Sequence, residues 1–188
     1  MQRPGRLLAL AGAFELSLGV LAFVLGAIVG LFPAERLRFH GAAIRAGLLA
    51  TVPLLLLFLL FLRLQITPVV RIRRLLYRLL APVVPELTPV VALFLGLAAG
   101  VGEELLFRGF LQEGLVRLVG LTPGILLGAV IFGLLHSLTP FYALYAALLG
   151  CFLGLLYHLS GSLVAPIIAH SLYDAVGLML LRRRLMDR

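Results

Sequence analysis

Residues 91–108 read VALFLGLAAGVGEELLFR, and this stretch decides the class of fold. It belongs to an apolar run that begins near Thr88 and is long enough to cross a bilayer, which takes ~20 residues. Glu103, Glu104 and Arg108 lie inside that run. A charge at the bilayer centre costs at least ~2.5 kcal/mol, so ionisable residues at that depth indicate a functional site. The stretch therefore predicts a membrane helix that carries part of such a site.

The composition of the whole chain agrees with a membrane protein. Of the 188 residues, 62% are hydrophobic and 13% are charged, whereas a soluble domain carries roughly 25% charged residues. This excludes a water-soluble fold, and the single cysteine, Cys151, excludes an intramolecular disulfide. We predict one domain over residues 1–188, an all-α polytopic integral membrane bundle of six transmembrane helices. Their expected ranges are 7–32, 46–62, 88–120, 124–138, 140–159 and 163–181.

A basic amphipathic segment separates the second and third apolar runs. Between residues 63 and 80, arginines alternate with Val, Ile and Leu, a pattern suited to a helix lying in the headgroup layer. All 16 basic residues are arginines: eleven fall on the side shared by the termini, four fall on the opposite side, and Arg108 lies inside a helix. This bias predicts that both termini are cytoplasmic. Because anionic headgroups account for these charges, we expect the lipid bilayer and no nucleic acid as a partner.

Two acids and a base share the third run. Glu104 and Arg108 are four residues apart, so they lie on one face of a helix and neutralise each other. The side chain of Glu103 points about 100° away from that of Glu104 in a regular helix. Glu103 is therefore left without a partner in its own helix and is available for chemistry.

Two later runs bring further polar groups to membrane depth. Phe132 and His136 are four residues apart in the fourth run, and His170 and Asp174 are four apart in the sixth. Each pair shares one face of its helix. Burying these groups together costs far less than exposing each of them to lipid. We expect them to converge with Glu103 on one water-containing cavity.

These side chains favour the activation of water. No Ser, Cys or Lys nucleophile stands in an obvious pairing with a base, which argues against covalent catalysis. Glu103 could remove a proton from water and His136 could relay it, while His170 and Asp174 could stabilise a developing oxyanion. A zinc ion held by His136, His170 and Glu103 is the alternative, although the sequence has no HExxH motif.

The three paired motifs resemble those of the CPBP family of intramembrane proteases, also called the ABI or CaaX-protease family. The similarity covers about residues 88 to 178, where Glu103-Glu104-x-x-x-Arg108, Phe132-x-x-x-His136 and His170-x-x-x-Asp174 occur in order. The resemblance implies a bacterial glutamate-dependent endopeptidase that cleaves near the C-terminus of a membrane-anchored or lipidated protein. It also implies that Glu103 activates water with help from His136. His170 and Asp174 would then form the oxyanion hole, and Glu104, Arg108 and Phe132 would support the site.

The last position of the third motif departs from the eukaryotic pattern. The eukaryotic enzymes that this chain resembles have Asn where it has Asp174. An ionised Asp only accepts hydrogen bonds, so Asp174 could stabilise an oxyanion only if protonated, or indirectly by orienting His170. The carboxylate also leaves the zinc alternative open, since family members are often labelled metalloproteases. We expect an enzyme without a cofactor, in the plasma (inner) membrane.

Two other classes of function use the same residues differently. A proton-coupled transporter would use them as a proton relay, although the sequence shows no inverted repeat or paired broken helices. A non-catalytic immunity or binding protein would keep the cavity and use it to capture a peptide. Glu15, inside the first run, is expected to be structural and to pair with a distant arginine.

Overall fold

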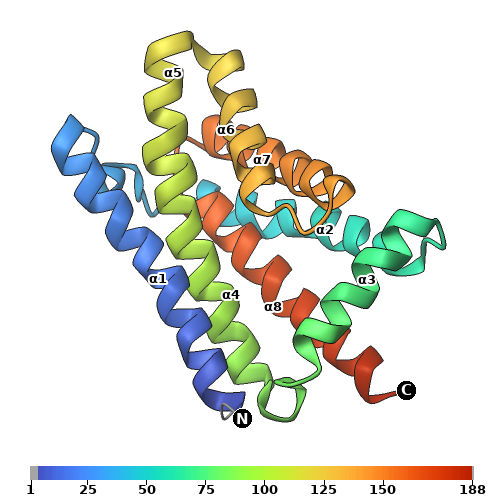
Figure 1. The fold of residues 1–188 in the computed structure, drawn as a ribbon. Helices are drawn as coiled ribbons and strands as arrows, with labels where there is room; N and C mark the ends of the chain where they lie inside the picture. The colour runs from blue at the N-terminus through green and yellow to red at the C-terminus, as the bar shows by residue number, and fades with distance from the viewer. Residues whose placement is uncertain (1–3, 188) are drawn as a thin grey trace.

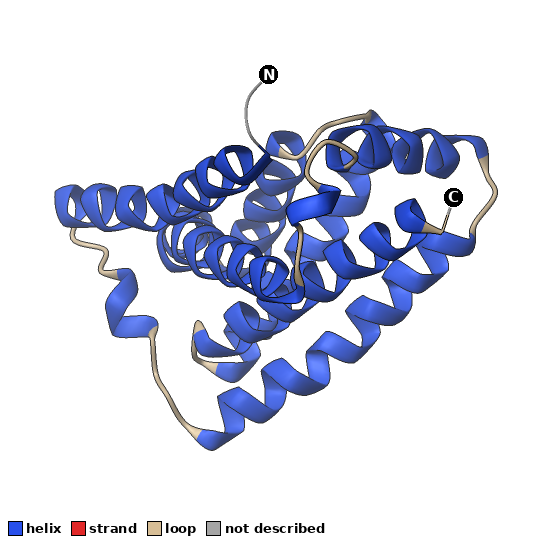
Figure 2. Cartoon of the chain, turned by 90° about the horizontal axis from the view of Figure 1, so that it is seen from below, coloured by secondary structure: helices blue, strands red, loops and turns tan. Residues whose placement is uncertain are grey.

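The computed structural model describes residues 4–187, and in this part of the chain every regular element is a helix (Figures 1 and 2). Short 3-10 turns, η1 and η2, lie on either side of the pair α2 and α3, and a π-helical segment, η3, joins α4 to α5 without a break. The chain is thus an all-α polytopic membrane bundle. Its elements are α1 Pro4–Val29, η1 Pro33–Arg36, α2 Gly41–Arg63, α3 Thr67–Leu80, η2 Val84–Glu86, α4 Pro89–Glu104, η3 Leu105–Gln112, α5 Glu113–Val119, α6 Leu121–Leu135, α7 Pro140–Ser160 and α8 Val164–Met186.

Five helices of the described chain are long and apolar enough to cross a membrane: α1, α2, the continuous helix Pro89–Val119, α7 and α8. The fourth expected run forms α6, which is apolar but has only 15 residues. At ~1.5 Å per residue it extends ~22 Å, less than the ~30 Å hydrocarbon core. Five of the six expected crossings therefore correspond to helices that are long enough to span a membrane, and the fourth corresponds to the short helix α6.

The residues at the helix N-termini show where the predicted helix starts agree with the structure and where they differ. Thr88 and Thr139 cap α4 and α7 by accepting hydrogen bonds from the amides of Val91 and Tyr142, and a proline follows each threonine. The fourth helix was expected to begin at residue 124. Instead Gly120, at φ 87°, turns the chain directly from α5 into α6, which starts at Leu121. This backbone angle favours glycine, and the helix begins three residues earlier than expected.

Helix α4 lies between α1 and α8, side by side with both (Figure 1). Small residues permit this close packing, as is common between membrane helices. A side chain at Gly100 would meet Ser171 of α8, and one at Gly102 would meet the backbone carbonyl of Glu15 in α1. The carboxyl residues that follow Gly102 are therefore held between two neighbouring helices.

The two ends of the bundle differ in chemistry. At one end Glu113 binds Arg36 through a 2.9 Å ion pair and accepts a hydrogen bond from the Tyr157 hydroxyl. At the other end Leu8, near the start of α1, shares an apolar cluster with Leu87 and with Met179 in α8. The described ends of the chain thus lie at the same end of the bundle, as Figure 1 shows.

Helix α3 is the amphipathic segment that the arginine pattern predicts. Val69, Ile72 and Tyr77 are buried in a cluster with residues of α2 and α8, whereas most of its arginines are exposed on the other face. Arg73 is the exception, because it turns inward and donates a hydrogen bond to the carbonyl of Leu62 near the end of α2.

Candidate active site

The core of the site is a buried ion pair on the third long helix. Arg108 donates a hydrogen bond to Oε1 of Glu104 at 2.7 Å, and these side chains are 2% and 0% exposed. The pair spans the junction at which α4 becomes the π segment η3. Such π turns occur frequently at functional sites. The wider π turn directs the Arg108 side chain toward α6 and α7.

Arg108 connects two further elements. A second guanidinium nitrogen donates to the backbone carbonyl of Gly150 in α7 at 3.1 Å. The guanidinium carbon lies 4.6 Å from the centre of the Phe132 ring in α6, a cation–π distance. Because a buried arginine has five N–H donors to satisfy, these contacts fix α6 and α7 against the motif on the third helix.

His170 of α8 is surrounded by carboxyl groups. Its Nδ1 lies 2.7 Å from Oε1 of Glu104, the oxygen that also binds Arg108. Its Nε2 lies 3.5 Å from Oδ2 of Asp174 and 3.9 Å from Oε2 of Glu103. An ionised carboxylate only accepts, so Nδ1 carries a hydrogen and Nε2 is directed to the space between Glu103 and Asp174.

His136 reaches the same carboxyl group from another direction. It follows the last turn of α6, where its ring stacks on Phe132 at 4.2 Å and its Nδ1 lies 2.8 Å from the Phe132 carbonyl. A carbonyl only accepts, so Nδ1 carries the hydrogen. The Nε2 atom faces Oε1 of Glu103 at 3.6 Å. A proton shared by these two atoms would form a hydrogen bond between the His136 imidazole and the Glu103 carboxyl group.

Glu103 stands where both imidazoles meet. Its side chain is buried, and Oε2 has no hydrogen-bond partner among the described residues. His136 is 30% exposed and Asp174 is 31% exposed, so the site is open on their side. The structure thus brings all seven residues singled out from the sequence into one constellation: Glu103, Glu104, Arg108, Phe132, His136, His170 and Asp174.

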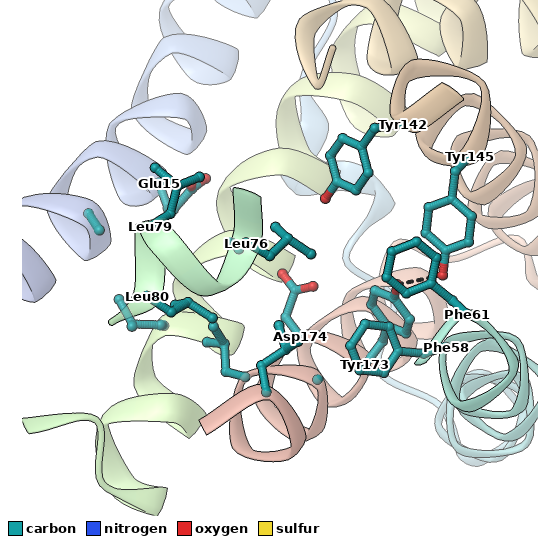
Figure 3. A pocket seen from close by; sticks show the side chains of 16 residues that line it. Glu15, Phe58, Phe61, Leu76, Leu79, Leu80, Tyr142, Tyr145, Tyr173 and Asp174 are labelled. Carbon is teal, nitrogen blue, oxygen red and sulfur yellow. Dashed lines mark hydrogen bonds between the residues drawn. The ribbon is translucent and has the colours of Figure 1, made fainter. Parts of the chain in front are cut away.

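A cavity of about 340 Å³ opens beside Asp174 (Figure 3). Its walls come from α1, α2, α3, α4, α7 and α8, and they are formed by aromatic and aliphatic side chains apart from two carboxyl groups. Asp174 projects into it opposite Tyr142, and Leu76 of α3 closes one side. The polar constellation therefore adjoins an apolar chamber within the bundle.

Sequence reasoning missed two contributions to this chamber. Glu15 of α1 is the second carboxyl group in the lining, and the expectation that it pairs with an arginine is wrong, because no such ion pair involves it among residues 4–187. Tyr145 and Tyr173 bond to each other through their hydroxyl groups at 2.9 Å, in the same wall. The depth of Glu15 in an apolar run was the only signal for it, and the neighbours of α1 could not be read from the sequence.

The zinc alternative needs at least three ligands that converge on one point. Across residues 4–187, no group of three or more His, Cys, Asp or Glu side chains is arranged to hold a metal ion. In the set His136, His170 and Glu103, the two Nε2 atoms lie 3.6 and 3.9 Å from the Glu103 carboxyl oxygens, and Nδ1 of His170 is directed to Glu104.

Comparison with known proteins identifies the part of the chain that holds this constellation. No curated protein and no solved structure matches the chain. Residues 85–176 match the family model described as type II CAAX prenyl endopeptidase Rce1-like. That range contains α4, η3, α5, α6 and α7 with the first half of α8, and all seven residues of the constellation. Residues 85–176, which hold the whole constellation, are thus similar to the Rce1-like type II CAAX prenyl endopeptidases.

Proposed function

We propose that this protein is an intramembrane endopeptidase that hydrolyses a peptide bond near the C-terminus of a membrane-anchored protein, with water activated by Glu103. The observation that carries the proposal is the approach of two imidazole Nε2 atoms, from α6 and α8, to the two oxygens of one buried carboxyl group. A base needs hydrogen-bond reach to the proton that it removes, and resting distances are often long before substrate binds.

In the proposed reaction Glu103 takes a proton from water as the water oxygen bonds to the scissile carbonyl carbon. The carbonyl π electrons move to oxygen and give a tetrahedral oxyanion. When this intermediate collapses, the C–N bond breaks and the leaving nitrogen takes a proton from Glu103, directly or through His136. The products are a carboxyl group and an amine, so atoms and charge balance without a covalent enzyme intermediate.

The other residues of the site position these groups. Nε2 of His170 is directed to the space between Glu103 and Asp174, where it would donate to the oxyanion when both ring nitrogens carry a hydrogen. Asp174 orients that ring from the cavity side. Glu104, held by Arg108, accepts the Nδ1 hydrogen of His170, so donation from Nε2 requires the doubly protonated imidazolium form of the ring.

The apolar chamber supports a substrate with a lipid anchor. The lining side chains of α2, α3, α7 and α8 include Phe58, Phe61 and Leu76, which offer no hydrogen bonds to a polar ligand. An isoprenoid chain in this chamber would bring an attached peptide to Asp174. We place the protein in the plasma (inner) membrane of a bacterial cell, with both termini cytoplasmic, as the arginine bias indicates.

The direct test is cleavage of a C-terminal reporter peptide by the purified chain in lipid nanodiscs. Wild-type protein should cleave a prenylated reporter, and Glu103→Gln should lower the rate at least ~100-fold, because general-base catalysis contributes about that much. Glu35→Gln removes an exposed carboxyl group outside the site and should cleave normally. Equal cleavage by wild type and Glu103→Gln would reject the mechanism and leave a binding protein or transporter.

We further propose that the reaction needs no metal ion. Treatment with a strong chelator, followed by removal of the chelator, should leave the cleavage rate unchanged, and added zinc should not raise it. A rate that falls with the chelator and returns with zinc would establish the metal-dependent alternative instead.

A further inference from the structure

Glu15 is an acidic residue that neither the motifs nor the proposed mechanism uses. It lies in α1, outside the matched residues 85–176, yet it lines the cavity with Asp174. Figure 3 shows its carboxyl group on the α1 side of this chamber. One carboxyl oxygen, Oε2, is buried and has no hydrogen-bond partner among the described residues. A buried oxygen of this kind is costly unless something satisfies it.

The packing of α1 on α4 brings Glu15 to the register of Glu103. A side chain at Gly102 would strike the backbone carbonyl of Glu15, so the two helices touch at the residue directly before Glu103. The ionisable neighbours of Glu15 are Glu103 of α4, Asp174 of α8 and His136 after α6. From α3 and α7 the cavity lining adds only leucines and tyrosines. No arginine is among the described residues that line this cavity.

Two carboxylates side by side repel each other, and one shared proton removes the repulsion. Glu103 has a buried Oε2 without a partner, and so does Glu15. A proton on Glu15 would turn it into a donor to the Glu103 carboxylate. One hydrogen would then satisfy two buried oxygens that are otherwise unpaired.

We propose that Glu15 is a positioning residue that holds a proton and donates it as a hydrogen bond to the Glu103 carboxylate. This inference rests on the proposed role of Glu103 as the base. This hydrogen bond would keep Glu103 ionised and hold its carboxylate in place until water binds. A neutral Glu15 also adds no negative charge beside the developing oxyanion, whereas an ionised Glu15 would oppose it.

Two substitutions separate this role from a packing role. Glu15→Gln keeps an N–H donor but cannot lose a proton, and Glu15→Leu keeps the volume without a donor. The Glu15→Leu variant should lower kcat by ~10- to 100-fold, the loss expected when a hydrogen bond to a charged group is removed. Gln should stay within a few-fold of wild type at neutral pH. It should also lose the decline in rate that wild type shows when alkaline pH removes the Glu15 proton. The control, Glu35→Gln, should keep both the rate and the decline.

An infrared measurement tests Glu15 without any substrate. The carbonyl band of a protonated carboxylic acid should be present in wild type at neutral pH and missing in Glu15→Gln. Its frequency should shift in Glu103→Gln, where an amide oxygen replaces the carboxylate acceptor. If Glu103→Gln cleaves normally while this band behaves as described, the role of Glu103 as the base is rejected. The proposal that Glu15 holds a proton is then still supported. Absence of the band in wild type, wild-type cleavage by Glu15→Leu, or an unchanged alkaline decline in Glu15→Gln would each overturn the proposal.

Discussion

Arg108 is the residue on which the internal structure of the site depends. It binds Glu104, the Gly150 carbonyl and the face of Phe132, with almost no exposure to solvent or lipid. Replacing it with Leu would leave the Glu104 carboxylate buried without its cation. Removing one partner of a buried pair typically costs ~3–5 kcal/mol. We expect Arg108→Leu to unfold at a much lower temperature in detergent than wild type.

The exposed Arg117 of α5 provides the matched control. Arg117→Leu removes the same side chain from a surface position, so its unfolding temperature should stay close to that of wild type. If Arg108→Leu were equally stable, the buried pair would not hold the helices together in the way described here.

Asp174 has a separate prediction, because its carboxylate lies 3.5 Å from Nε2 of His170 and faces the cavity. Asn at this position can still accept from the imidazole and can in addition donate to an oxyanion. Asp174→Asn should therefore keep its cleavage rate within about tenfold of wild type, as loss of roughly one kcal/mol implies. Asp174→Leu should lose far more. Equal rates for Asn and Leu would mean that Asp174 does not orient His170.

At the residue scale the motif residues could be predicted because each is ionisable or aromatic at a depth where lipid penalises polar groups. Spacing within one helix also identified the Glu104–Arg108 pair, which the structure contains. The link from His170 to Glu104 was not foreseen, since it joins residues 66 positions apart. Glu15 was misjudged for the same reason: its neighbours lie on α4 and α8, and no spacing in the sequence records that packing.

At the scale of elements, the approach of α1 to α4 depends on Gly102. A methyl group there would meet the Glu15 carbonyl, and overpacking of this kind costs ~1–3 kcal/mol. It would also push α1, and with it Glu15, away from Glu103. We expect Gly102→Ala to lower both the unfolding temperature and the cleavage rate.

Gly128 of α6 is the comparison for this prediction, because a methyl group there would have its nearest neighbours at 3.8 Å, an ordinary contact distance. Gly128→Ala should be neutral or slightly stabilising, since Ala favours a helix over Gly by up to ~1 kcal/mol. Similar losses in both variants would contradict the close approach at Gly102.

Most elements could be predicted because apolar length and proline or threonine starts are local signals. The exceptions depend on other parts of the fold. The helix that begins at Pro89 continues through a π segment to Val119, and nothing in the spacing indicates the wider turn. Helix α6 ends at Leu135, one residue before His136, so that the ring can turn back on Phe132 and face Glu103.

At the scale of the whole molecule, the described ends of the chain should lie on one side of the membrane and η1 on the other. In a Cys151→Ala background, single cysteines replacing the exposed Arg6, Met186 and Arg38 report these positions. With intact bacterial cells, an impermeant maleimide should label only the cysteine at position 38. Labelling at position 6 or 186 in intact cells would contradict cytoplasmic termini.

The central claim is that three helices hold an acid and two imidazoles together so that they cleave an amide bond. The most direct measurement is a comparison of protein C-termini in membranes from cells that produce wild type or Glu103→Gln at equal levels. The account predicts a set of membrane-anchored proteins that are shortened at the C-terminus only with wild type. Identical C-termini in both membranes, with a cognate substrate confirmed to be present, would contradict it.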